Sequence, residues 1–165
     1  MLLNTIGYEG LQINEFFDLL IENGIQTIVD IRDNPISRKP GFSKNSLIKT
    51  SKDNNLNYIH LVALGCPKEI RNSYRNNNDW SLYTNRYLTY LRTQSKEIDN
   101  LINIVKNEIC CLLCFEADYF YCHRRYVANT IKIRIDCDLT INHIRAQREE
   151  PVVWLKPLED ILVRQ

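Results

Sequence analysis

The sequence predicts an α/β fold in which a mostly parallel sheet of about five strands is flanked by helices in three layers. Three observations predict it. Short runs rich in β-branched residues alternate with segments in which apolar residues recur at helical spacing. Turns that contain glycine, proline or asparagine separate the two kinds of segment. The chain of 165 residues, 44% of them hydrophobic and 25% charged, has the size and composition of one soluble domain.

The first unit is a strand, a helix and a second strand, predicted over residues 2–8, 13–21 and 25–32. Ile13, Phe17 and Leu20 recur at the spacing of one helix face. Asn23-Gly24 ends the helix, because these residue types readily adopt positive φ. The second strand is apolar enough to lie buried in a parallel sheet.

A loop, a helix and a third strand follow. Asn34-Pro35 predicts a loop after the second strand. Ser43 is suited to cap a helix that runs to about Asn54. Residues 56–64 are predicted as the third strand, which Gly65-Cys66-Pro67 ends.

Helices are expected in much of the stretch before the fourth strand. Residues 68–79 are polar and rich in asparagine, so we expect a surface loop or a short helix there. Asp79 is suited to cap a helix that carries Tyr83, Tyr87 and Tyr90. An aromatic stripe at this spacing is more often core than a platform for stacking bases. Helical periodicity continues to Lys106.

The last third of the chain completes the sheet. Residues 108–116 are the most apolar stretch and predict the fourth strand, a helix follows over about 122–134, and 139–144 predict a fifth strand. Right-handed crossovers between these strands give a Rossmann-like sheet. We therefore predict a single domain over 1–165, with its core at 4–145 and the tail 146–165 docked on it.

Charge gives little indication of a partner over the chain as a whole, because the net charge is +1. The exception is the segment 32–52, which contains six basic residues. This segment is a candidate for contact with an anionic small molecule or nucleic acid. A solvated loop and helix face is the alternative.

The cysteines and the apolar runs favour a cytoplasmic protein without membrane contact. Four of the six cysteines fall within residues 110–122, where neighbouring strand positions point to opposite faces and cannot easily form disulfides. Asn4 and Glu9 interrupt the first apolar region, unlike a signal peptide. No apolar stretch has the length of a membrane span. The sequence gives no indication of the oligomeric state.

The carboxyl ends of parallel strands share one edge of the sheet, which is where such sheets bind ligands. Eight chemically capable side chains follow predicted strands and are expected at that edge: Glu9, Arg32, Arg38, Glu116, Asp118, Cys122, His123 and Arg124. Tyr8 precedes the first of these, and His60, near the end of the third strand, is expected as a hydrogen-bonded residue at the pocket floor.

These residue types are suited to binding and transforming an anion. Arg32, Arg38 and Arg124, with the helix that begins near residue 122, offer planar donors and unpaired N–H groups to a phosphate or carboxylate. Glu116, with Asp118 or Glu9, is suited to general acid–base catalysis. The alternative is a structural network of arginines and carboxylates that joins the loops to the sheet.

Cys122 admits two interpretations. At a helix start beside His123 and Arg124 its pKa should fall, which suits a nucleophile. The favoured alternative is a small buried residue under the helix. An arginine six residues further on would indicate a cysteine phosphatase, but position 128 is Ala.

No metal site and no cofactor are predicted. A zinc deaminase needs a Pro-Cys-x-x-Cys segment, which the sequence lacks. Cys111 and Cys114 would point to opposite faces of a strand. A disfavoured alternative remains, in which Cys114, Cys122 and His123 meet a metal together with Cys66. There is no P-loop and no glycine-rich dinucleotide fingerprint.

The chain resembles the family called domain of unknown function 488 (DUF488). The matching pieces are Thr5–Gly10, Ile28–Pro35 with Ser37-Arg38, Phe42–Lys44, Leu47, Tyr58–Leu61, Leu64-Gly65, Tyr87, Cys114–Asp118 and Cys122–Arg124. They are colinear over about residues 4–145, and Tyr8 stands where many members carry histidine. The resemblance implies an α/β domain of this length with a site at the matched positions, and it brings no established activity.

Three functional hypotheses follow. The leading one is an enzyme that acts on a phosphate-bearing or otherwise anionic substrate, such as a nucleotide or nucleic acid. The second is a non-catalytic module that binds nucleic acid or protein through the segment 32–52. The third is thiol or sulfur-transfer chemistry at Cys122.

Overall fold

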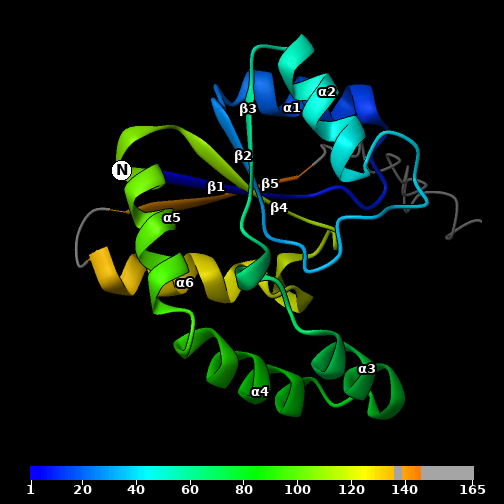
Figure 1. The fold of residues 1–165 in the computed structure, drawn as a ribbon, viewed down its shortest axis with the longest axis vertical. Coiled ribbons are helices and arrows are strands. Elements are labelled where there is room, and N and C mark those ends of the chain that lie inside the picture. Colours follow the sequence, from blue (N-terminus) through cyan, green and yellow to red (C-terminus); the bar gives the residue numbers. More distant parts are fainter. Residues whose placement is uncertain (136–138, 146–165) are drawn as a thin grey trace, which may run out of the picture.

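A computed structural model describes residues 1–135 and 139–145 (Figure 1). The elements in chain order are β1 (Leu2–Gly7), α1 (Ile13–Glu22), β2 (Thr27–Asp30), α2 (Lys44–Asp53), β3 (Asn57–His60), the 3₁₀ turn η1 (Val62–Leu64), α3 (Lys68–Asn77), α4 (Trp80–Arg92), α5 (Ser95–Asn107), β4 (Cys110–Cys114), the 3₁₀ turn η2 (Tyr119–Tyr121), α6 (Arg124–Ile135) and β5 (Thr140–Ile144). The tail 146–165, predicted to dock on the domain, lies outside the described residues.

All strand pairs of the sheet are parallel, and the strand order is β3-β2-β4-β1-β5. Every residue of β2 and of β4 is buried, whereas the edge strands β3 and β5 are partly exposed. Continuous apolar runs such as Cys110–Cys114 therefore belong to strands that helices cover on both faces. The predicted α/β fold with a parallel sheet is confirmed.

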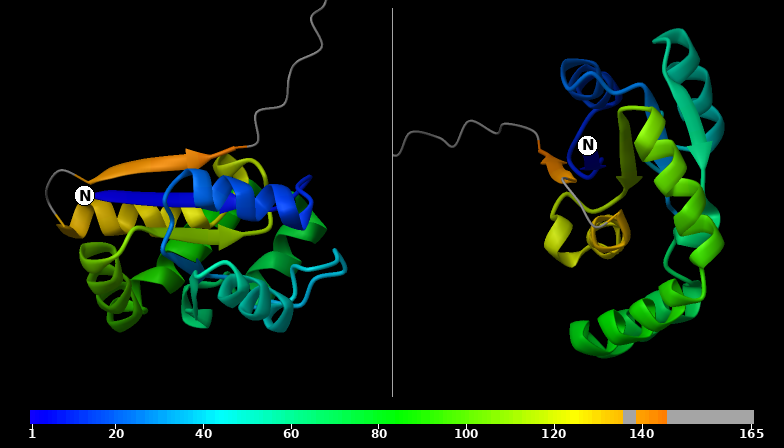
Figure 2. Two further views of the ribbon diagram at one scale, coloured as in Figure 1. Left: turned by 90° about the horizontal axis from the view of Figure 1, so that it is seen from above. Right: turned by 90° about the vertical axis from the view of Figure 1, so that its left-hand side faces the viewer.

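Helices form a layer on each face of the sheet (Figures 1 and 2). Phe16 and Leu47, from α1 and α2, share one core with Cys111 and Leu113 of β4. Leu101 and Val127, from α5 and α6, share the opposite core with Cys110 and Leu112 of the same strand. The alternation along β4 places consecutive side chains on opposite faces, as expected for a strand.

The α3–α4 hairpin lies at the end of the molecule away from α1 and α2 (Figure 1). Tyr74 of α3 and Tyr83 of α4 pack edge to face, with ring centroids 5.5 Å apart. Asp79 caps α4 as predicted, by accepting a hydrogen bond from the backbone N–H of Leu82. Residues 68–77, expected as a loop or short helix, form the ten-residue helix α3.

The third strand is shorter than predicted. It ends at His60, and residues 62–64 form a 3₁₀ turn instead of continuing the sheet. The hydroxyl of Tyr87 donates to the carbonyl of Leu64 at 2.6 Å, and that of Tyr90 donates to the carbonyl of Ala63 at 2.9 Å. These bonds satisfy carbonyls that a strand would have paired with its neighbour.

None of the helices in the described part of the chain is long and apolar enough to cross a membrane.

Candidate functional site

The strand ends of the sheet border a cavity of about 710 Å³, which we call the central cavity. Segments that follow β1, β2, β3 and β4 line it, together with the α3–α4 hairpin. The chain leaves β2 toward one edge of the sheet and leaves β4 toward the other. Such a reversal opens a crevice at the carboxyl ends of the strands, where α/β proteins bind ligands. The cavity thus lies at the sheet edge where the sequence predicts a site.

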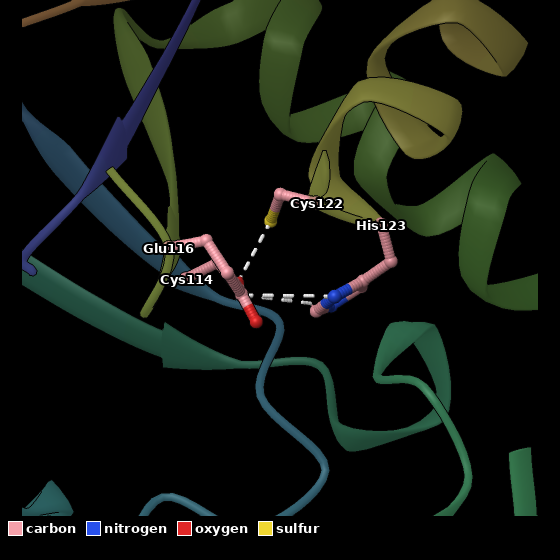
Figure 3. Close-up of side chains that lie close together, drawn as sticks. All are labelled: Cys114, Glu116, Cys122 and His123. Carbon is pink, nitrogen blue, oxygen red and sulfur yellow. Dashed lines mark hydrogen bonds between the residues drawn. The ribbon is translucent and has the colours of Figure 1, made fainter. Parts of the chain in front are cut away.

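Four side chains converge at the floor of the central cavity, Cys114, Glu116, Cys122 and His123, which we call the floor cluster (Figure 3). Cys114, Glu116 and His123 line the cavity, whereas Cys122 is buried and does not line it. The thiols of Cys114 and Cys122 both donate to Glu116 Oε2, at 3.0 and 3.1 Å. Cys114 Sγ lies 3.6 Å from His123 Nδ1. Among the described residues, this is the group whose donor atoms are placed to share a metal ion.

The folded loop after β4 creates this cluster. Cys114 ends β4, and the short turn η2 returns the chain so that Cys122 and His123 lie beside it. Asp118 stabilises the turn, because its carboxylate accepts from the backbone N–H of Phe120 at 2.9 Å. The helix α6 begins at Arg124, so Cys122 precedes the helix instead of opening it as predicted.

Mutual contacts set the protonation of the floor cluster. Burial raises the pKa of Cys122 well above its ordinary value, and neighbouring Cys114 and Glu116 raise it further. Burial alone would raise the pKa of Glu116, but the charge of His123 and the two thiol hydrogen bonds outweigh it and lower the pKa. For His123, burial alone would lower the pKa, but contacts with Cys122 and the charge of Glu116 raise it.

The raised pKa of Cys122 contradicts the prediction that its position beside His123 and Arg124 lowers it. The thiol is buried beside a carboxylate and another thiol, and both neighbours disfavour a thiolate. The favoured alternative, a buried cysteine, agrees with the geometry. Cys66, the fourth residue of the disfavoured metal set, lines the central cavity but does not belong to the floor cluster.

Arg32 is buried in a wall of the central cavity and is held by protein groups. It binds the Asp30 carboxylate through Nε at 2.9 Å and Nη2 at 2.5 Å, and its Nη1 donates to the Tyr8 hydroxyl at 3.1 Å and to the Phe42 carbonyl at 2.8 Å. Burial alone would lower its pKa, but Asp30 raises it. Tyr8 itself stacks on Phe42 at 4.4 Å. Arg32 and Tyr8 therefore shape the wall, with few donors left for a ligand.

Arg38 lines the same cavity and is exposed. Two further arginines, Arg71 and Arg75, also line it and were not predicted from the sequence. Arg71 Nη2 pairs with Asp33 at 2.5 Å, while its buried Nε has no hydrogen-bond partner among the described residues. Arg71 and Arg75 are four residues apart, so they share one face of α3. Their four-residue spacing could have indicated a shared helix face, but the surrounding asparagines predicted a surface loop.

Aromatic side chains from the α3–α4 hairpin and η2 form the remaining wall of the central cavity. Trp80 stacks on Tyr83 with ring centroids 4.5 Å apart, and it meets Tyr74 and Tyr121 edge to face. All four rings line the cavity. Tyr83, expected as core, is indeed buried, yet it also borders the cavity.

Two predicted binding residues do not line the central cavity. Arg124 is buried, and its guanidinium donates to the backbone carbonyls of Glu116 and Ala117. It fixes the loop after β4 instead of facing a ligand. His60 binds the carbonyl of Arg32 through Nε2 at 2.9 Å, and its Nδ1 lies 3.2 Å from Lys44 Nζ. The prediction of a hydrogen-bonded His60 agrees with these contacts.

Glu9 and Asp118 line a smaller cavity of about 280 Å³, which we call the edge cavity. Glu9 Oε2 accepts from the backbone N–H of Ala117 at 2.9 Å. Asp118 lies 3.7 Å from the guanidinium of Arg145. The structure therefore separates these two carboxylates from Glu116, with which the sequence grouped them.

Comparison with known proteins gives one match. The family profile described as "Domain of unknown function DUF488" matches residues 12–131. That span contains the floor cluster and the arginines of the central cavity, and it begins after the Thr5–Gly10 motif on which part of the resemblance rested. Searches of curated proteins and of solved structures return no match. Because the match covers most of the chain, this protein belongs to the DUF488 family.

Proposed function

We propose that this protein is an enzyme that acts on a phosphate-bearing substrate, a nucleotide or a nucleic-acid segment, held in the central cavity. One observation carries the proposal. Arg38, Arg71 and Arg75 border a cavity whose floor holds a carboxylate and an imidazole. Guanidinium groups suit phosphate oxygens, and acid–base groups nearby suit the transformation of the bound molecule.

The arginines have capacity for an anion. Among the described residues, Arg38 and Arg75 form no ion pair, and Arg71 keeps an unpartnered buried Nε. The Nε atom itself is closed off from solvent, so an anion in the cavity would meet the Nη groups of Arg71 and the guanidinium groups of Arg38 and Arg75. Asp33 orients Arg71 through their 2.5 Å ion pair, so less side-chain freedom is lost on binding.

The aromatic wall favours a substrate with a flat ring. Trp80 and Tyr121 are partly or largely exposed and line the cavity. Bases stack on such rings in single-stranded nucleic acids and nucleotides. The volume of about 710 Å³ lies in the range of small-molecule sites, which suits a nucleotide.

The reacting groups of this proposal come from the floor cluster. Glu116 Oε2 is held by the two thiols, and the carboxylate lines the central cavity, where it is placed to exchange a proton with a substrate. His123 provides a second polar group on the cavity floor. Glu9 and Asp118 line the edge cavity, so the proposal assigns acid–base work to Glu116.

Five free thiols among the described residues support a reducing compartment, and we propose the cytoplasm.

The test is a turnover screen with nucleoside mono-, di- and triphosphates and with short single-stranded oligonucleotides. Released phosphate, nucleoside and cleaved strands are measured. We expect turnover of at least one substrate by the wild type and loss of that turnover in E116Q. Lys49→Ala is the matched control, because Lys49 is exposed on α2 and lines none of the cavities.

The same screen distinguishes the proposed enzyme from a non-catalytic binding module. Such a module would bind oligonucleotides without turnover, would lose affinity steeply with added salt, and would lose it in a variant with Lys49 and Lys52 both changed to Ala. Binding of that kind, unchanged by E116Q, would contradict the proposed enzyme.

A further inference from the structure

The floor cluster has the donor set of a transition-metal site. Its four donor atoms, two thiol sulfurs, one imidazole nitrogen and one carboxylate oxygen, all lie within 4.8 Å of one another. In a tetrahedral zinc site with bonds of about 2.0–2.3 Å, ligand atoms lie roughly 3.3–3.8 Å apart. The contacts of 3.0, 3.1 and 3.6 Å within the cluster are close to that spacing.

The orientation of His123 is an independent observation that points to a ligand. Its Nε2 lies 3.0 Å from the carbonyl oxygen of Ile31, which can only accept, so Nε2 carries the proton. In the neutral ring the lone pair is then on Nδ1, the nitrogen nearer to Cys114 Sγ. A histidine that ligates a metal commonly donates its other N–H to a backbone carbonyl in this way. The Tyr87 ring packs against His123 at 5.4 Å and restricts its rotation.

The surroundings of the cluster favour a cation. Two thiols and a carboxylate face one another, and the nearby guanidinium of Arg124 is engaged by the carbonyls of Glu116 and Ala117. Within the described residues, Glu116 accepts both thiol protons at the same oxygen, an arrangement that a divalent ion replaces by direct bonds. Both thiols are buried, and thiolate sulfur is a common ligand of structural and catalytic zinc sites.

We propose that Cys114, Glu116, Cys122 and His123 bind a divalent transition metal, with Zn²⁺ as the best fit. Thiolate sulfur with imidazole nitrogen favours Zn²⁺ over Mg²⁺ or Ca²⁺, which take oxygen ligands. On binding, each thiol, and His123 Nδ1 when it is protonated, releases its proton to solvent, and each of the four donor atoms forms one bond to the ion. This site replaces the disfavoured set that included Cys66, and its existence does not depend on the proposed function.

The position of the metal site beside the central cavity points to a role for the bound ion. Cys114, Glu116 and His123 line the central cavity, so a bound ion lies at the floor beneath the three arginines. Four protein donors would fill a tetrahedral shell, so the ion would polarise a phosphate oxygen or activate a water molecule only after the Glu116 carboxylate leaves it and opens one position. This catalytic role, unlike the binding site itself, rests on the proposed function.

The experiment measures zinc in the reduced full-length chain after removal of metal, reloading with Zn²⁺ and desalting. We expect about one zinc per chain, as for a site with four protein donors, and a loss of affinity of at least roughly tenfold in C114A and in C122A. C66A and C110A are matched controls, since both remove a buried thiol outside the cluster, and both should retain the metal. Affinity is read by competition with a coloured chelator.

A second measurement on the wild type keeps the test decisive if C114A or C122A fails to fold. X-ray absorption of the zinc-loaded protein should show two sulfur neighbours, with nitrogen or oxygen completing the shell. Absence of stoichiometric zinc in the reduced protein, equal loss in C66A, or a shell without sulfur would each overturn the site. Zinc that binds as expected in a protein without turnover of phosphate compounds would overturn the proposed function and leave the metal site standing.

Discussion

The central cavity and the edge cavity lie along the same end of the sheet, yet their charges differ. The floor of the central cavity is a carboxylate with two thiols, and these groups raise the pKa of His123 against the effect of burial. His143 does not itself line the edge cavity but directly precedes Ile144 and Arg145, which do. Burial and then the charges of Arg124, Arg145 and Arg125 lower the pKa of His143 from 6.5 to about 4. Charged residues gathered at one sheet edge therefore do not form one site.

The two cavities differ because residues that are close in the sequence line different cavities. Tyr8 lines the central cavity and Glu9 the edge cavity, because consecutive side chains at the end of β1 point to opposite sides. Glu116 lines the central cavity and Asp118 the edge cavity because the loop after β4 turns between them, since strand alternation alone would place residues two apart on the same side. The guanidinium of Arg124 donates to the carbonyls of Glu116 and Ala117 and so holds the backbone of this loop in place. The loop thus supplies a wall to each cavity.

The largest expected effect comes from exchanging one carboxylate in each cavity for its amide. E116Q removes the proposed proton-exchanging group, so we expect kcat/KM for a substrate found in the screen to fall about 10²–10⁴-fold. D118N changes a carboxylate that serves the edge cavity, so kcat/KM should stay within about twofold. Steady-state kinetics on both purified variants measures the contrast. Equal losses in the two variants would mean that the cavities act as one site.

A smaller effect is expected from removing one exposed arginine from each cavity. Arg75 lines the central cavity, while Arg145 lines the edge cavity and approaches Asp118. R75A should weaken nucleotide binding about tenfold, the effect of losing one charge-assisted hydrogen bond, whereas R145A should leave it unchanged. The fluorescence of Trp80, read in a background in which Trp154 is changed to Phe, reports binding.

The dissociation constant of R75A should also depend less on salt than that of the wild type, since one fewer ion contact forms. An R145A variant that binds as weakly as R75A would place the anion in the edge cavity instead, and the proposed substrate position would be wrong.

Local patterns predicted much of the fold. The apolar run of β4 and the Asp79 cap of α4 depend on residues adjacent in sequence, and both are confirmed. The helix α3 was uncertain because its asparagines give weak local preference, and packing of Tyr74 on Trp80 and Tyr83 of the following helix α4 supports it. Arg71 and Arg75 were missed for that reason.

The site was predictable in its residue types and only partly in its geometry. Strand position places Cys114 and Glu116 at the correct edge of the sheet. The return of η2, which brings Cys122 to Glu116, depends on tertiary contacts that no spacing rule contains. Arg124 illustrates the same limit, since its sequence position suits anion binding while its partners prove to be backbone carbonyls.

The smallest expected effect concerns His143 and the dependence of stability on pH. Its Nδ1 lies 2.7 Å from Thr5 Oγ1, and its ring stacks on Tyr119 at 3.6 Å. With a folded pKa of about 4 against 6.5 in the unfolded chain, only the unfolded state takes up this proton between those values. His143 therefore contributes stability that is present above pH 6.5 and is lost as the pH falls toward 4.

Urea unfolding of the wild type and of H143Q at pH 7 and pH 5 tests this contribution. The wild type should lose more stability over that interval than H143Q, because glutamine does not titrate and retains polar atoms for Thr5. Between pH 7 and pH 8 the two proteins should change alike, since neither state of His143 gains a proton there. An identical loss in both proteins from pH 7 to pH 5 would show that neither burial nor the nearby arginines lower the pKa of His143, and the electrostatic contrast between the two cavities would then rest on the floor cluster alone.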